Sequence, residues 1–167
     1  MTIRSEASKS SSASPAAATL EVGALTVTKF MSARSFFDTN VLIYGDDGSE
    51  PIKQRLATSL FAEHRSRRTG VVSLQVLQEY FVVATRKLGI EPLVARRKVE
   101  LIAELDVATP DVSDILAAID LHRLHGFSFW DALILRSATL AGCTVLFSED
   151  FQDERKIEGL RIVNPFR

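Results

Sequence analysis

The sequence predicts an α/β domain of three layers, in which helices cover both faces of a central, mainly parallel sheet. The prediction depends on two observations. Short apolar runs of strand length recur along the chain, and longer segments with helical spacing of apolar residues separate them. Parallel neighbours need a crossover between them, and a helix is the usual crossover. The carboxyl ends of such strands meet at one edge of the sheet, which is where sites are expected.

The first half of the chain supplies two strands and two helices. The run "SFF" at 35–37 is a short strand, and Pro51 favours the start of a helix. The apolar residues of that helix share one face: Ile52, Leu56, Leu60 and Phe61. "GVVS" at 70–73 is the second strand. A strong helix then runs from an N-cap at Ser73 toward Gly89, which suits a helix end.

The second half continues the alternation. A helix begins near Pro92, and "DVATP" at 106–110 is strand-like. Another helix spans 114–126 and ends at Gly126, and a further one spans 128–142. "TVLF" at 144–147 and "LRIVNP" at 160–165 are the last two predicted strands.

Composition divides the chain into a tail and one domain. Residues 1–34 include a Ser/Ala-rich stretch that we expect to be disordered, and Met31 is a candidate translation start. Residues 35–167 form the predicted folded domain. The net charge of -1 excludes a strongly basic nucleic-acid-binding domain. No apolar run is long enough to span a membrane, and the single cysteine indicates no disulfide, so we expect a cytoplasmic protein.

Four carboxylates stand in unusual places. Asp38 and Asp150 each follow a predicted strand, so both reach the same edge of a parallel sheet. Glu79 and Asp131 lie on helix faces whose neighbours one turn away are mostly apolar. Buried carboxylates need compensation, and a hard divalent cation such as Mg²⁺ or Mn²⁺ supplies it. The cluster therefore predicts a metal site that acts on phosphodiesters.

Each carboxylate also has an ordinary structural explanation. Asp131 follows Ser128 by three residues and matches a capping box, which is the favoured interpretation of that position by itself. Asp38 is a potential helix cap and Asp150 a potential turn residue. Glu79 is a potential partner of Arg86, two turns away, or of a residue of another helix. The sequence lacks the motifs of P-loop ATPases, α/β-hydrolases and dinucleotide-binding domains.

Four segments in this order carry a family resemblance: "FFDTNVLIY", "SLQVLQEYFVVATRKL", "FSFWDALILRSATLAG" and "VLFSEDFQD". Together they resemble a PIN domain, specifically the VapC-like toxin ribonuclease of bacterial toxin-antitoxin pairs. The resemblance covers residues 35–167 and implies an Mg²⁺-dependent endoribonuclease, with Mn²⁺ as a substitute, whose products carry a 3′-hydroxyl and a 5′-phosphate. It also implies a homodimer and a cognate antitoxin protein that inhibits the enzyme.

Residue by residue, the resemblance places Asp38, Glu79, Asp131 and Asp150 on the acidic quartet of the family. It assigns supporting roles to two polar residues and one further acid, namely Asn40, Ser148 and Asp153. It makes five arginines candidates for RNA phosphate contacts, namely Arg65, Arg67, Arg68, Arg96 and Arg97. Two alternatives remain open: an inactive PIN-like module that only binds RNA or protein, and a structure-specific DNA nuclease.

Overall fold

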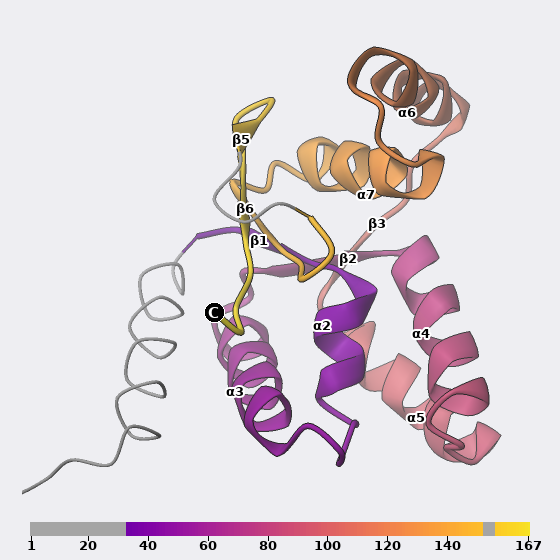
Figure 1. Ribbon diagram of the computed structural model, residues 1–167, viewed down its shortest axis with the longest axis vertical. Coiled ribbons are helices and arrows are strands. Elements are labelled where there is room, and N and C mark those ends of the chain that lie inside the picture. Colours follow the sequence, from indigo (N-terminus) through magenta and orange to yellow (C-terminus); the bar gives the residue numbers. More distant parts are fainter. Residues whose placement is uncertain (1–32, 152–155) are drawn as a thin grey trace, which may run out of the picture.

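The centre of the protein is a six-stranded sheet with the strand order β3-β2-β1-β4-β6-β5 (Figure 1). The computed structural model describes residues 33–151 and 156–167. The strands are β1 (Ser35–Phe37), β2 (Gly70–Ser73), β3 (Asp106–Ala108), β4 (Val145–Phe147), β5 (Lys156–Ile157) and β6 (Leu160–Val163). All neighbouring strands run parallel except β5 and β6. The predicted mainly parallel sheet is therefore confirmed.

Helices cover both faces of this sheet. They are α2 (Thr39–Tyr44), α3 (Pro51–Arg67), α4 (Leu74–Arg86), α5 (Pro92–Ile102), α6 (Val112–His125) and α7 (Phe129–Leu140). In Figure 1, α2 to α5 lie below the sheet and α7 lies above it, with α6 packed on α7. The three-layer α/β/α fold class predicted from the sequence is confirmed.

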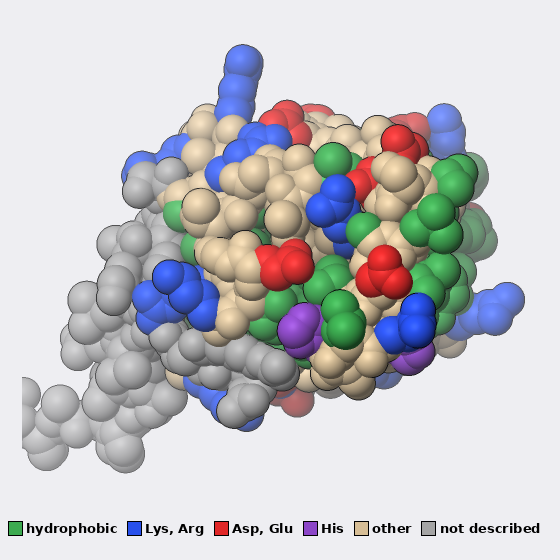
Figure 2. All heavy atoms as spheres, turned by 90° about the horizontal axis from the view of Figure 1, so that it is seen from above, with side chains coloured by type: hydrophobic (Ala, Val, Ile, Leu, Met, Phe, Trp, Pro, Cys, Tyr) green, Lys and Arg blue, Asp and Glu red, His purple; other side chains and the backbone are tan. Residues whose placement is uncertain are grey.

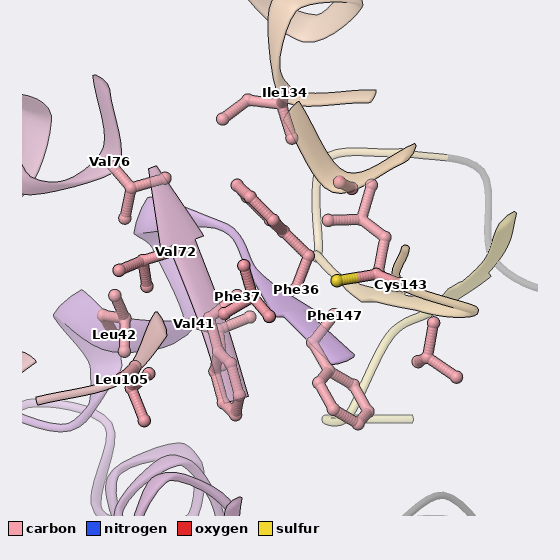
Figure 3. Packing of buried hydrophobic residues seen from close by; sticks show 14 of the residues in the cluster. Phe36, Phe37, Val41, Leu42, Val72, Val76, Leu105, Ile134, Cys143 and Phe147 are labelled. Atoms are coloured by element: carbon pink, nitrogen blue, oxygen red, sulfur yellow. The ribbon is translucent and has the colours of Figure 1, made fainter. Parts of the chain in front are cut away.

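The central strand β1 shows why the core forms on both faces. Phe36 and Phe37 are both fully buried, and successive side chains of a strand point to opposite faces. In Figure 3, the Phe36 ring points toward Ile134 of α7, while Phe37 lies on the other side of the sheet. There the Phe37 ring contacts the His64 ring of α3 edge-on, at a centroid distance of 5.4 Å. One strand with two phenylalanines thus anchors both helical layers.

Helix ends largely follow the caps expected from the sequence. Asp38 caps α2, and its carboxylate accepts a hydrogen bond from the Thr39 N–H. Ser73 caps α4 as predicted, and Gly126 ends α6 with a φ of 71°. The predicted apolar face of α3 is only partly right, because Ile52 is 51% exposed while Leu60 is fully buried.

The β5–β6 hairpin was not predicted. Its loop consists of Glu158 and Gly159, which have φ angles of 49° and 86°. Two successive positive φ angles are typical of the tight turn that joins antiparallel strands. The hairpin adds a short antiparallel edge beside β6.

Several expectations concern residues outside the described ranges. The Ser/Ala-rich tail, the candidate start at Met31 and the supporting acid Asp153 all lie there, so these expectations stay predictions. At the beginning of the described chain, Arg34 already contacts the domain, since its Nε donates to the Ala141 carbonyl at 2.7 Å. None of the described helices combines the length and the apolar character that a membrane span needs.

Candidate active site

The register of β1 and β4 brings two predicted site residues together. Phe37 pairs with Phe147, so the next residues, Asp38 and Ser148, leave the sheet side by side. The Ser148 hydroxyl donates to Asp38 Oδ2 at 2.7 Å, and the Thr39 N–H donates to Asp38 Oδ1 at 2.7 Å. Asp38 is only 8% exposed. It is therefore both the cap of α2 and a buried carboxylate at the carboxyl edge of the sheet.

Asn40 links the two strand-end aspartates. Its side-chain amide donates to Asp150 Oδ2 at 2.9 Å, to Asp38 Oδ2 at 3.2 Å and to Ser148 Oγ at 3.2 Å. The Asn40 Oδ1 atom accepts from the Glu149 N–H at 3.3 Å. Asp38, Asn40, Ser148 and Asp150 form one hydrogen-bonded cluster. In this cluster the neutral Asn40 and Ser148 hold two carboxylates near each other.

Glu79 reaches the same region from α4. Its Oε2 accepts from the Thr39 hydroxyl at 2.9 Å, and its Oε1 accepts from the Gln75 amide at 2.8 Å. The alternative of an ion pair is not observed, since no basic side chain of the described chain lies within bridging distance of Glu79. Its two neutral donors fix the direction of the carboxylate and leave its charge uncompensated.

Asp131 does not behave as the acid of a capping box. The Ser128 hydroxyl caps α7 by accepting from the Asp131 N–H at 3.1 Å. Within the described residues, the Ser128 N–H does not donate back to the Asp131 carboxylate, whereas α6 has both halves of such a box at Asp111 and Asp114. The half-buried Asp131 side chain instead lines the cleft that holds Asp38.

This cleft has a volume of about 600 Å³. It is bounded by α2, one face of α4, the first turns of α7 and the residues after β4. The α4 residues are spaced by four positions, which places them on one helical face. They are Gln75, Glu79, Val83 and Lys87. The cleft brings together all four predicted acids: Asp38, Glu79, Asp131 and Asp150.

The electrostatics of Asp38 indicate an uncompensated site. Burial raises the pKa of its carboxyl from 3.8 to about 6, although hydrogen bonds from Ser148 and Thr39 favour the charged form. Repulsion from Asp150 and Glu79 raises the pKa further. No basic side chain in the described ranges pairs with any of the four acids. A buried, repelling set of oxygen ligands is what a hard divalent cation stabilises.

The spacing of the acids limits how a metal ion could bind. Among the described residues, no three acidic, histidine or cysteine side chains converge closely enough to enclose an ion by themselves. Mg²⁺ commonly binds through one or two carboxylates, keeps several waters and completes its coordination with substrate phosphates. The pair Asp38 and Asp150, both bound to the Asn40 amide, fits that mode, and Glu79 and Asp131 line the same cleft.

Comparison with protein families assigns the chain. A family model described as PIN domain matches residues 35–156, which is more than half of the chain. The chain belongs to the PIN domain family. No curated protein matches it. The PIN fold predicted from the four sequence segments is therefore confirmed.

Two solved structures share the fold of this PIN domain. A toxin-antitoxin complex from Klebsiella pneumoniae aligns with a TM-score of 0.59 and 22% identity, covering 78% of this chain and 97% of that one. Mycobacterium tuberculosis VapC20, a Sarcin-Ricin loop cleaving toxin, aligns with a TM-score of 0.54 and 21% identity. That alignment covers 70% of this chain and 91% of VapC20.

The five arginines proposed to contact RNA do not line the acidic cleft of the PIN domain. Three of them form ion pairs with neighbouring glutamates: Arg65 with Glu104, Arg67 with Glu63 and Arg96 with Glu100. Arg68 and Arg97 are also exposed on the surface. These five arginines could bind RNA only outside the cleft, and their RNA contacts stay a prediction.

The cleft also includes residues that lie outside the predicted set of site residues. Lys87 and Trp130 line it. Lys53 lies beside it and donates to the Tyr44 hydroxyl at 2.9 Å while pairing with Glu149. Lys87 could have been found from its spacing of eight residues from Glu79, which places both on one side of α4. Trp130 directly precedes Asp131 and carries no sequence signal of its own.

Asp131→Asn separates the two interpretations of this position. Because Ser128 provides the cap and only the Asp131 backbone takes part, we expect the free energy of unfolding to change by less than about 0.5 kcal/mol. We expect Mn²⁺ affinity to fall, since a neutral amide is a weaker ligand than a carboxylate. Urea unfolding and calorimetric Mn²⁺ titration measure the two effects. Unchanged Mn²⁺ binding would show that Asp131 is not a ligand.

Proposed function

We propose that this PIN domain is a metal-dependent endoribonuclease and the toxin of a toxin-antitoxin pair. The carrying observation is the buried Asp38 carboxylate, linked to Asp150 through Asn40 and Ser148 and lacking any basic partner in the described chain. The two structural neighbours support the proposal, since one is a toxin-antitoxin complex and the other a toxin that cleaves the Sarcin-Ricin loop. Residues 35–167 would form the nuclease unit.

The proposed cofactor is Mg²⁺, for which Mn²⁺ can substitute. Asp38 and Asp150 would hold it, and Glu79 and Asp131 would complete the acidic set. Held there, Mg²⁺ would supply a water molecule of lowered pKa and positive charge against the phosphodiester.

The protein groups around the acids have a positioning role. Ser148 and Asn40 hold Asp38 and Asp150, whereas Thr39 and Gln75 hold Glu79. These donors are neutral, so they orient the carboxylates without reducing the negative charge that attracts a cation. The Asp131 carboxylate accepts no hydrogen bond within the described residues, which would leave its oxygen atoms available as ligands for the cation.

The proposed partners follow from the same assignment. The substrate would be RNA, and the inhibitor would be a cognate antitoxin protein, as in the Klebsiella pneumoniae complex. A homodimer is the proposed oligomeric state. The five arginines, on α3, at its C-terminal end and on α5, would contact only RNA that extends beyond the cleft.

The test is RNA cleavage by the purified full chain with Mg²⁺ and with EDTA, beside the Asp38→Asn variant. We expect cleavage in Mg²⁺, no cleavage in EDTA and at least a hundredfold loss of rate in the variant, on the order of the loss of a group that stabilises the transition state. The matched control is Asp120→Asn, the same change at an exposed position of α6 that should leave the rate unaltered.

Three results would contradict the proposal. Cleavage that persists in EDTA would exclude metal dependence. Failure to cleave any RNA, together with no measurable Mn²⁺ binding, would favour a PIN-like module that only binds RNA or protein. Cleavage of DNA flaps in preference to RNA would favour the structure-specific DNA nuclease.

A further inference from the structure

Trp130 is a large aromatic side chain left exposed in the acidic cleft. It is the only tryptophan of the chain, and it is 60% exposed. Its position is fixed by the backbone, because it is the second residue of α7 and the Ser128 cap defines the start of that helix. Its ring contacts the Phe129 ring edge-on at a centroid distance of 5.2 Å. The protein thus presents an indole face that its own core does not use.

The immediate surroundings of Trp130 combine apolar contact with charge. Ile134 lies one turn further along α7, and Val83 faces the same cleft from α4. Lys87 lies one turn beyond Val83 and provides a cation in the lining. Asp131, the next residue after Trp130, belongs to the acidic set. The apolar side of the cleft can therefore accept a flat ring. Lys87 suits a phosphate, and Asp131 suits a metal ion.

We infer that Trp130 is a stacking platform for an unpaired base of the RNA, next to the phosphodiester that the acids attack. This inference rests on the proposed function and adds to it a residue that binds the substrate, through the accessible base faces of single strands and loops. Bases within a duplex have their faces covered by their neighbours, whereas unstacked bases are readily bound on aromatic side chains. Stacking tolerates any base, so it selects for strandedness and not for sequence.

A protein partner is the competing occupant of an exposed aromatic ring. A different surface of this chain suits a protein better. The groove between α4 and α5 is almost entirely apolar and includes Leu77, Phe81 and Leu93. Phe81 faces away from the cleft on α4. Figure 2, which looks onto the α6 and α7 side, shows a second group of exposed hydrophobic side chains along one edge of the molecule. Only Trp130 among the exposed large hydrophobic residues of the described chain lines the acidic cleft.

The test uses the fluorescence of Trp130, which has no other tryptophan to obscure it. The full chain carries Asp38→Asn, so that RNA is bound and not cut, and Mg²⁺ is present. A mixed-sequence RNA strand of about ten nucleotides, within the usual range of single-strand site sizes, is titrated alone and annealed to its complement. We expect saturable quenching by the single strand and little quenching by the duplex.

Variants then measure what the ring contributes. In the same background, Trp130→Ala should raise the Kd for the single strand by roughly 5- to 150-fold, measured by fluorescence anisotropy of labelled RNA. Trp130→Phe should lie between the parent and Trp130→Ala because it keeps a smaller ring. Phe81→Ala is the matched control on the other face of α4 and should leave the Kd unaltered. Thermal unfolding confirms that each variant is folded.

The outcomes distinguish this inference from the proposed function. Stacking is wrong if Trp130→Ala binds the single strand with the Kd of the parent, or if the duplex quenches the Trp130 fluorescence as strongly as the single strand does. The Trp130 ring would then be a candidate contact for a protein partner. Metal-dependent cleavage by the unmodified chain would still stand in that case. If no RNA is bound and none is cleaved by the unmodified chain, the stacking platform and the nuclease are both rejected.

Discussion

In EDTA at neutral pH, Asp38→Asn is expected to be more stable than the unmodified protein, although it should have lost its nuclease activity. The buried Asp38 carboxyl has a pKa of about 6 in the folded protein, against 3.8 in its ordinary environment. A difference of about two units corresponds to roughly 3 kcal/mol of cost to the folded state once the group is ionised. Replacement by a neutral amide removes that cost.

Part of this gain is lost through hydrogen bonds. The amide introduced by Asp38→Asn would keep one oxygen for the Thr39 N–H and place its NH₂ group where Asp38 Oδ2 now accepts from Ser148 and Asn40. The Ser148 hydroxyl can rotate and accept a hydrogen bond from the new NH₂ group. The Asn40 NH₂ group cannot, so two donors would face each other there. Since a hydrogen bond contributes about 1 kcal/mol, we expect a net stabilisation of about 1 to 2 kcal/mol in urea unfolding.

The effect should depend on pH and on metal. The folded state holds the Asp38 proton more tightly than the unfolded state, so the stability of the unmodified protein falls as pH rises from about 4 through about 6. The advantage of Asp38→Asn should therefore grow over that range and level off above it. Mg²⁺ should remove the advantage by stabilising only the unmodified protein. A less stable variant in EDTA at neutral pH would contradict the uncompensated carboxylate.

Asp38 also shows what could be inferred from the sequence and what could not. Its place after an apolar strand predicted both a helix cap and a site residue, and the structure shows that it caps α2 and lies in the cleft. From the sequence, the helix cap and the site residue were alternatives, because each pattern predicts one role for the residue. One carboxylate has two oxygen atoms, and here each serves a different purpose.

The convergence of the acids was predictable, whereas the basic and aromatic lining was not. Parallel strands and helical spacing bring Asp38, Glu79, Asp131 and Asp150 to one cleft. Clustering of arginines along the chain carried no information about which face of α3 or α5 they occupy. Trp130 was passed over because exposure of a single aromatic residue depends on tertiary packing. The β5–β6 hairpin was missed because Glu158 stands at the first turn position, where Asn, Asp or Gly usually marks such a loop.

Arg136→Met is expected to cause a clear loss of stability, although Arg136 lies outside the cleft. Arg136 of α7 binds Asp114 of α6. Its Nε atom lies 2.9 Å from Asp114 Oδ1, and its Nη2 atom lies 2.8 Å from the same oxygen. Asp114 is only 5% exposed. Without Arg136 it would stay buried as an uncompensated charge, which typically costs about 3 to 5 kcal/mol. The Arg136 side chain is 31% exposed and the Asp111 N–H still donates to Asp114, so we expect about 2 to 3 kcal/mol.

The control and the double variant identify the cause. Arg123→Met removes an exposed arginine of α6, whose nearest carboxylate atom is 3.9 Å away, and should change the free energy of unfolding by less than about 0.5 kcal/mol. Adding Asp114→Asn to Arg136→Met should restore part of the stability, since an amide keeps an oxygen for the Asp111 N–H without the charge. If the double variant is no more stable than Arg136→Met, packing of the arginine stem against α6, and not the buried charge, joins α6 to the helix that carries Trp130 and Asp131.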